Sequence, residues 1–377
     1  MERKLPVNPK RIVVKVGTGI LTSPNYLPNK AWIKKLTAQI AALITDQNIQ
    51  VILVTSGAIG AGMGLLGLSA RPKLLPQQQA AAAIGQSQLM KIYNSFFKAH
   101  NLLTAQILLT NEDLSSRQRY LNAKNTLLTL LNYKVIPIIN ENDTVSVEEI
   151  KFGDNDRLSA LVAALIQADL LIILSDVDGL YTGGIEKSKP GQKKAILPLV
   201  AEITPEIEKL ATAGKSKAGT GGMISKIAAA KICGTTGLPC VIANGKTPGI
   251  LDKILANKNI GTLFLPQEEQ LAGKKRWIRF NTKVKGQIIV DEGAKEALSL
   301  KNKSLLPKGI TAVQGSFAIG DTISILDQQG QEFARGLANY SSEELHKIKG
   351  QKSSQIEAVL GYKYYDEVIH RDNLVIL

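Results

Sequence analysis

Apolar positions along the chain fall into short continuous runs that alternate, up to about residue 265, with longer segments of helical periodicity. The short runs have the length of buried strands and are 12–16, 51–55, 106–109, 135–139, 170–174 and 239–242. The longer segments are 30–46, 75–100, 116–131, 156–168 and 223–235. This alternation predicts a doubly wound α/β domain in which a mostly parallel sheet is sandwiched by helices.

A different pattern begins after Gly273, where short β-like pieces are separated by glycine and proline. These pieces are 286–290, 304–309, 321–325 and 332–337. A chain of 377 residues also exceeds the size at which one core usually keeps growing. We therefore predict an α/β domain at 1–265, a basic linker at 266–280 and a small β-rich domain at 281–377.

The formal net charge of +14 is compatible with nucleic acid, a membrane surface or small anionic ligands as partners. Residues 273–377 hold 16 Lys and Arg against 12 Asp and Glu, so most of the excess lies in the first domain and is spread along the chain. The basic cluster between Lys274 and Lys285 is either a solvated linker face or a phosphate-contacting patch.

The sequence lacks a long apolar run and a secretory signal, so we expect a soluble cytoplasmic protein. Its two cysteines, Cys233 and Cys240, are spaced neither as a metal knuckle nor as a redox pair. We expect both to be buried and reduced.

Two polar clusters follow the predicted strand at 135–139. The first, 140–143, contains Asn140 and Asp143, and the second, 153–156, contains Asp154, Asn155 and Asp156. Taken singly, Asn and Asp are common as helix caps and turn residues. Ligands of open α/β sheets bind beyond the carboxyl ends of the strands, so four carboxylates and three amides here indicate recognition of a small polar molecule.

Lys15 occupies a position in a predicted parallel strand where Val or Ile would be expected. Either this strand is an edge and the ammonium group is solvated, or Lys15 points from the strand end into a site for negative charge. Gly17 and Gly19 follow at once and permit close approach of the backbone to a phosphate, which favours the second interpretation.

Three further segments have the composition of anion or nucleotide sites. The glycine-rich turn 55–64, with Ser56 and Gly57, follows a strand and leads into a helix. The segment 219–226 opens a predicted helix and is either a phosphate-binding loop with a cation at Lys226 or a flexible loop with a solvated lysine. Ser175 and Asp176 end another strand, where they could contact a nucleotide.

This inventory favours phosphoryl transfer. It contains two lysines on separate glycine-rich loops and a cluster of acids and amides, whereas His100, His346 and His370 fall in no motif with a nucleophile. Phosphoryl transfer needs little covalent chemistry from the protein beyond positioning and neutralisation of charge. No Walker-type string is present, so the chain is not expected to be a P-loop nucleotide hydrolase.

The ordered set Lys15-Val-Gly-Thr, Thr55-Ser-Gly-Ala, Asn140-Glu-Asn-Asp, Gly153-Asp-Asn-Asp and Thr220-Gly-Gly-Met closely resembles the glutamate 5-kinases of the amino-acid kinase family. The second domain resembles the PUA domain of the bacterial members through Val290-Asp-Glu-Gly-Ala, Leu305-Leu-Pro-Lys-Gly-Ile and His370-Arg-Asp. The resemblance covers nearly the whole chain. It implies ATP-dependent phosphorylation of the γ-carboxylate of L-glutamate, the first step of proline synthesis, with Mg²⁺ held mainly by the nucleotide phosphates.

The resemblance also implies roles for individual residues. Lys15 and Lys226 would flank the transferring phosphoryl group, with Asp156 holding both lysines. Glutamate would be gripped by acids near its ammonium group and by amides that donate to a carboxylate; the residues implied for substrate binding are Gly17, Ser56, Gly57, Asn140, Asp143, Asp154 and Asn155. The residues implied for nucleotide binding are Lys15, Ser175, Asp176, Thr220, Gly221, Gly222, Met223, Ile224, Ser225 and Lys226.

Further implied partners are proline as a feedback inhibitor, copies of the same chain in a dimer or tetramer, and γ-glutamyl phosphate reductase as acceptor of the product. Two alternatives stay open at this point. One is a related kinase acting on acetylglutamate, aspartate, carbamate or a nucleoside monophosphate. The other is an RNA-binding PUA protein, against which the modest charge of residues 273–377 and the lack of an aromatic-rich strand both argue.

Overall fold

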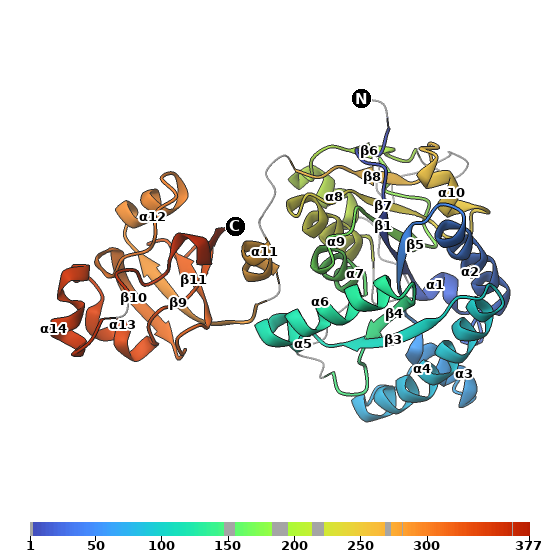
Figure 1. Ribbon diagram of the computed structural model, residues 1–377, viewed down its shortest axis with the longest axis horizontal. Coiled ribbons are helices and arrows are strands. Elements are labelled where there is room, and N and C mark those ends of the chain that lie inside the picture. The colour runs from blue at the N-terminus through green and yellow to red at the C-terminus, as the bar shows by residue number, and fades with distance from the viewer. Residues whose placement is uncertain are drawn as a thin grey trace. The chain divides into compact units, whose positions relative to one another are not determined.

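The structure is a computed structural model that describes residues 3–146, 155–182, 195–212, 222–267, 273–280, 282–363 and 365–377. The chain forms two compact units, Met1–Gln270 and Leu271–Leu377 (Figure 1). Among the described residues, no helix combines the length and the apolar character needed to cross a membrane.

The first unit is built on a sheet with the strand order β3-β4-β2-β1-β5-β7-β8-β6. The strands are β1 (Arg11–Val16), β2 (Gln50–Val54), β3 (Thr104–Leu109), β4 (Ile136–Glu141), β5 (Leu170–Ser175), β6 (Leu199–Val200), β7 (Cys240–Asn244) and β8 (Thr262–Phe264). All neighbouring pairs are parallel except β7 and β8, which are antiparallel. The predicted mostly parallel α/β architecture is therefore confirmed.

Helices cover both faces of this sheet, with α7, α8 and α9 on one side and α2 and α10 on the other (Figure 1). The helices of the unit are α1 (Thr18–Leu21), α2 (Lys30–Thr45), α3 (Ala58–Leu65), α4 (Leu75–Lys98), α5 (Asn111–Ser115), α6 (Arg117–Asn132), α7 (Asn155–Leu165), α8 (Pro205–Thr212), α9 (Met223–Thr235) and α10 (Ile250–Leu255). The five predicted long helices are present within a few residues of their expected ends.

Residue alternation in β1 decides which face each side chain meets. Ile12, Val14 and Val16 belong to the core shared with α2, α4 and α10. Since side chains alternate along a strand, Val13 and Lys15 face the opposite side, where α7 packs on β1 and β5. The single lysine of the strand is thereby directed towards α7 and α9.

Helices α3 and α4 pack unusually closely because two glycines lie at their crossing. A Cβ atom on Gly62 would stand 1.8 Å from the carbonyl oxygen of Ala81, and one on Gly85 would stand 1.8 Å from that of Ala58. Residues 55–64 were expected to form a turn that leads into a helix, whereas α3 already begins at Ala58. Gly62 therefore serves in helix packing.

The second unit contains a sheet with the order β10-β9-β11-β12-β13. Its strands are β9 (Val284–Val290), β10 (Ile310–Gly315), β11 (Thr322–Leu326), β12 (Glu332–Leu337) and β13 (Leu374–Ile376), and its α-helices are α11 (Gly273–Phe280), α12 (Glu292–Ser299), α13 (Ser342–Ile348) and α14 (Ile356–Leu360). Its own core includes Ile288, Ile323, Tyr340 and Ile369, all fully or almost fully buried.

Two segments of the second unit differ from the expectation. Residues 304–309 were predicted as β-like, but Pro307–Gly309 form a 3₁₀ turn ahead of β10, since proline cannot donate a ladder hydrogen bond. The predicted linker 266–280 includes α11, which packs on β12 and β13. Trp277 and Ile278 are buried there, and Lys275 and Arg279 are half-buried.

Candidate active site

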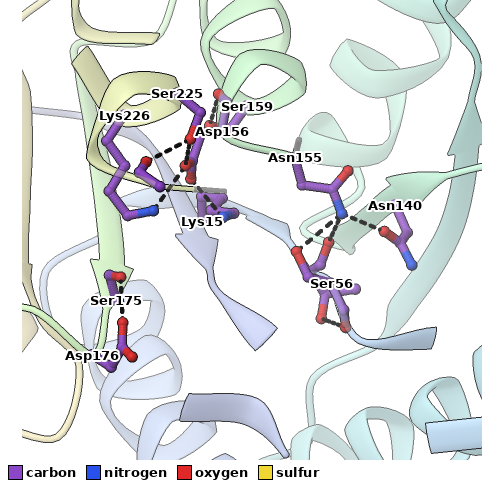
Figure 2. A network of polar contacts seen from close by, with 12 residues as sticks. Lys15, Ser56, Asn140, Asn155, Asp156, Ser159, Ser175, Asp176, Ser225 and Lys226 are labelled. Atoms are coloured by element: carbon purple, nitrogen blue, oxygen red, sulfur yellow. Dashed lines mark hydrogen bonds and ion pairs between the residues drawn. The ribbon is translucent and has the colours of Figure 1, made fainter. Parts of the chain in front are cut away.

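Two buried lysines converge on one buried carboxylate. Lys15 Nζ lies 2.5 Å from Asp156 Oδ1, and Lys226 Nζ lies 3.0 Å from Asp156 Oδ2 (Figure 2). The exposed fractions are 3% for Lys15, 4% for Lys226 and 0% for Asp156, which removes this cluster from bulk water. Each oxygen of the carboxylate anchors one ammonium group, so both cations are held at defined positions.

The local structure explains why these three residues meet. Lys15 lies one residue before the end of β1, Asp156 in the first turn of α7 and Lys226 in the first turn of α9. Helices α7 and α9 pack against each other on the sheet face that Lys15 enters. An aspartate in the first turn of a helix also interacts favourably with the helix dipole.

Ser225 adds a third contact to the carboxylate. Its hydroxyl lies 2.9 Å from Asp156 Oδ2 and 2.8 Å from the carbonyl oxygen of Gly222. Because the hydroxyl has a single proton, it can donate either to the Asp156 carboxylate or to the Gly222 carbonyl, but not to both at once. Ser225 therefore connects the first turn of α9 to the anchor of the lysines.

The loop after β1 borders the same cluster. The amide of Gly17 donates to the carbonyl oxygen of Leu174 at 3.0 Å, so this N–H joins β1 to β5. A Cβ atom on Gly17 would stand 3.9 Å from Lys15 Nζ, and one on Gly19 would stand 3.2 Å from Asp176 Oδ2. The two glycines thus keep side chains away from the ammonium group of Lys15 and the carboxylate of Asp176.

Ser175 and Asp176 lie at the end of β5, beside this loop. The hydroxyl of Ser175 donates to Asp176 Oδ1 at 3.1 Å. Ser175 is buried, whereas Asp176 is exposed. The exposed carboxylate is therefore a polar group that a ligand can reach.

A chain of amides occupies the other side of the α7 start. Asn155 Nδ2 lies 2.7 Å from the carbonyl oxygen of Thr55, 3.0 Å from Ser56 Oγ and 2.7 Å from Asn140 Oδ1. Figure 2 shows these contacts separated from the lysine cluster by the backbone step from Asn155 to Asp156. The consecutive residues Asn155 and Asp156 therefore contribute to different halves of the site: the Asn155 amide lies among the amides, and the Asp156 carboxylate lies between the two lysines.

The structure locates the other predicted residues as follows. Gly57 is the N-cap of α3 with a left-handed φ of 85°, which favours glycine. Asp143 is half-buried in the turn after β4. Gly222 caps α9, Met223 is buried and Ile224 is 58% exposed. Asp154, Thr220 and Gly221 lie outside the described residues.

Sequence reasoning missed two groups on α4. Gln86, 7% exposed, accepts from Asn140 Nδ2 at 2.9 Å, and the hydroxyl of Tyr93 lies 3.0 Å from that of Thr55. The signal that could have identified Gln86 is its position on the apolar face of the helix. It lies four residues after Ala82 and three before Leu89, and both of these side chains are buried. A glutamine on the buried face of a helix requires a polar partner.

Cys233 and Cys240 are both buried, as expected, and lie in α9 and β7. Burial raises the pKa of the Cys240 thiol well above its usual value, and a hydrogen bond with Cys233 raises it further. In the part of the chain that the structure describes, no group of three or more His, Cys, Asp or Glu residues could hold a metal ion.

Comparison with known proteins places the chain among relatives of the same length and organisation. Residues 10–244 match the amino acid kinase family, and residues 286–360 match the PUA domain. The glutamate 5-kinase of Caldanaerobacter subterraneus subsp. tengcongensis is 55% identical over 368 residues, which cover 97% of this chain and 98% of that protein. The glutamate 5-kinase of Geobacter sulfurreducens is 50% identical, with 98% of each chain covered.

Proposed function

The chain belongs to the amino-acid kinase family, with a C-terminal PUA domain, and from this premise we propose that it transfers the γ-phosphoryl group of ATP to the γ-carboxylate of L-glutamate. The product would be γ-glutamyl phosphate, the activated acid from which proline synthesis begins. Full-length similarity to proteins named glutamate 5-kinase supports this choice of substrate.

One observation carries the proposal: Lys15 and Lys226 are held on the two oxygens of Asp156 at the carboxyl end of the sheet. An ammonium group has three N–H donors. Lys226 donates one of them to Asp156 Oδ2, and Lys15 forms an ion pair with Asp156 Oδ1. Fixed cations of this kind stabilise charge that develops in a transition state without first reorganising solvent.

In the proposed step, an oxygen of the glutamate γ-carboxylate forms a bond to the γ-phosphorus of ATP. The bond from that phosphorus to the β,γ-bridging oxygen breaks, and ADP leaves with the electron pair. Lys15 and Lys226 would neutralise negative charge on the entering and leaving sides, and Asp156 would keep both lysines in place. Mg²⁺, bound mainly to nucleotide phosphates, would supply additional positive charge.

The two substrates would occupy the two halves of the site. We infer that ATP lies over Ser175, Asp176 and the start of α9, where no atom of the described residues lies within 4 Å of a Cβ placed on Gly222. Glutamate would lie beside Ser56, Gly57, Asn140, Asp143 and Asn155. Since Asn155 and Asp156 are consecutive, the acceptor and the phosphoryl group would meet at the first turn of α7.

The test of this function is glutamate-dependent formation of ADP in the presence of Mg²⁺, with hydroxylamine to trap the acyl phosphate. We expect γ-glutamyl hydroxamate to accumulate in step with ADP. Acetylglutamate and aspartate serve as competing acceptors under identical conditions. A higher kcat/KM for either of them would contradict the assignment of glutamate.

Inhibition by proline, assembly of several copies and transfer of the product to a reductase are further parts of this proposal, drawn from the family. Addition of proline to the hydroxamate assay checks the first of them. The location of the protein, which the sequence predicts to be cytoplasmic, stays a prediction.

A further inference from the structure

Three amide side chains form a hydrogen-bonded row from α4 through β4 to α7. Asn155 Nδ2 donates to Asn140 Oδ1 at 2.7 Å, and Asn140 Nδ2 donates to Gln86 Oε1 at 2.9 Å. Asn140 is 1% exposed and Gln86 is 7% exposed, so the row is largely shielded from water. The mechanism described above gives Gln86 no role.

Two backbone groups fix the direction of this row. The carbonyl oxygen of Thr55 only accepts, so the group of Asn155 that lies 2.7 Å from it is the NH₂. The amide N–H of Glu141 only donates, so Asn140 turns its oxygen to it, at 3.0 Å. Asn140 is left with its NH₂ towards α4, where it meets the oxygen of Gln86.

The fixed direction leaves one acceptor without a hydrogen bond at the substrate end. Within the described part of the chain, Asn155 Oδ1 and Gln86 Nε2 are buried and have no hydrogen-bond partner. Buried polar atoms of this kind are rare in folded proteins. In Figure 2 the oxygen of Asn155 lies on the side of the amide away from the Nδ2 contacts.

An unfilled acceptor suits a ligand that brings N–H donors. The α-ammonium group of an amino acid has three, and it is the group that distinguishes glutamate from the simple diacid glutarate. The donors of Asn140 and Asn155 already point at protein acceptors. Asn155, whose oxygen is the unfilled acceptor, is therefore better arranged to present that oxygen to an ammonium group than to donate to a carboxylate.

We propose that Gln86 is a positioning residue for substrate selection: its oxygen holds the NH₂ of Asn140 and so adds to the two backbone groups in keeping Asn155 Oδ1 turned towards the ammonium group of the acceptor. This inference rests on the proposed function and extends it to a residue of α4. Helix α4 makes a second polar contact with the sheet at the end of the neighbouring strand β2, where the hydroxyl of Tyr93 lies 3.0 Å from that of Thr55.

The test compares Gln86→Met with Gln78→Met. Methionine has a similar volume but offers no strong acceptor to Asn140. Gln78 lies on the same helix, is 9% exposed and bonds to Pro72 and Arg71, outside the amide row. For each variant the KM for L-glutamate, the KM for ATP and the inhibition constant of glutarate are measured.

For Gln86→Met we expect the KM for glutamate to rise about tenfold, as when a hydrogen bond to a charged group is weakened. The KM for ATP and the inhibition constant of glutarate should stay within about twofold of the wild-type values, since neither ligand has an α-ammonium group. Preference for glutamate over glutarate should therefore fall by the same factor. Gln78→Met should retain all three wild-type values.

An unchanged preference for glutamate over glutarate in folded Gln86→Met would overturn the inference, as would an equal rise in the constants of all three ligands. If Gln86→Met does not fold, Gln86→Glu decides, because it keeps the acceptor for Asn140. Its KM for glutamate should stay within about threefold of wild type, and a tenfold rise would overturn the inference. A wild-type enzyme that forms no acyl phosphate from glutamate would instead overturn the proposed function itself.

Discussion

At the scale of single residues, the first turn of α7 divides the site. Asp156 contacts the two lysines, and Asn155 contacts the strand ends of β2 and β4. A side-chain substitution at either position would act mainly on its own half. Loss of Asp156 should impair turnover, whereas loss of Asn155 should impair binding of the acceptor.

The two cysteines allow a test of burial near the lysine cluster. Because burial raises the pKa of Cys240, the reactive thiolate fraction at pH 8 is smaller than for a free cysteine. We expect native protein to resist iodoacetamide at this pH, while protein in denaturant is alkylated at both Cys233 and Cys240. Mass spectrometry measures the difference, and rapid alkylation of the native protein would show that this region is open.

The sequence identified Lys15, Lys226 and Asp156 as candidates because three signals are visible without coordinates. They are a charge in an apolar strand, a glycine-rich segment that opens a helix and a polar cluster after a strand. It did not identify Gln86, which precedes Asn140 by more than fifty positions and belongs to no polar cluster. Only the packing of α4 against the strand ends brings this amide into the site.

At the scale of elements, the crossing of α3 and α4 determines where Ser56 and Gln86 lie. Gly62 and Gly85 leave no room for a side chain between the helices. Both helices contribute to the half of the candidate site that we propose for glutamate, because α3 starts directly after Ser56 and Gly57, and α4 carries Gln86.

We expect Gly62→Ala to destabilise the protein by about 2 kcal/mol or more, since the added methyl would overlap a backbone carbonyl that cannot move alone. Gly60→Ala is the matched control on the same helix, where a Cβ atom would be 3.6 Å from its nearest neighbour. The control should be neutral or stabilising by about 0.5 kcal/mol. Denaturant unfolding at constant m-value measures both, and equal midpoints would contradict this account of the crossing.

The long helices were predictable because each carries a clear apolar period, and the strands β1 to β5 and β7 because each contains a short continuous apolar run. The two-residue β6 and three-residue β8 are too short for a period to be visible. The 3₁₀ turn at Pro307–Gly309 was predicted as β-like because few residues there carry a local signal. Helix α11 lies within the segment that was predicted as a basic linker.

At the scale of the whole molecule, the strand order places β1 between β2 and β5. The chain builds β2, β3 and β4 on one side of β1 and then crosses to place β5 and β7 on the other side. Open α/β sheets form ligand sites where the strand order reverses in this way. The site is assembled from the ends of β1, β2, β4 and β5 and the first turns of α7 and α9. Its parts are separated by up to about two hundred positions in sequence, so only the fold brings them together.

The central claim is that Lys226, held by Asp156, stabilises the charge of the transferring phosphoryl group. The most direct test is kcat for hydroxamate formation by Lys226→Met beside Lys231→Met, a change in the same helix at an exposed lysine paired with Glu208. We predict a loss of about a hundredfold or more for Lys226→Met, with a folded protein, and wild-type kcat for Lys231→Met. Equal kcat in the two variants would contradict the account.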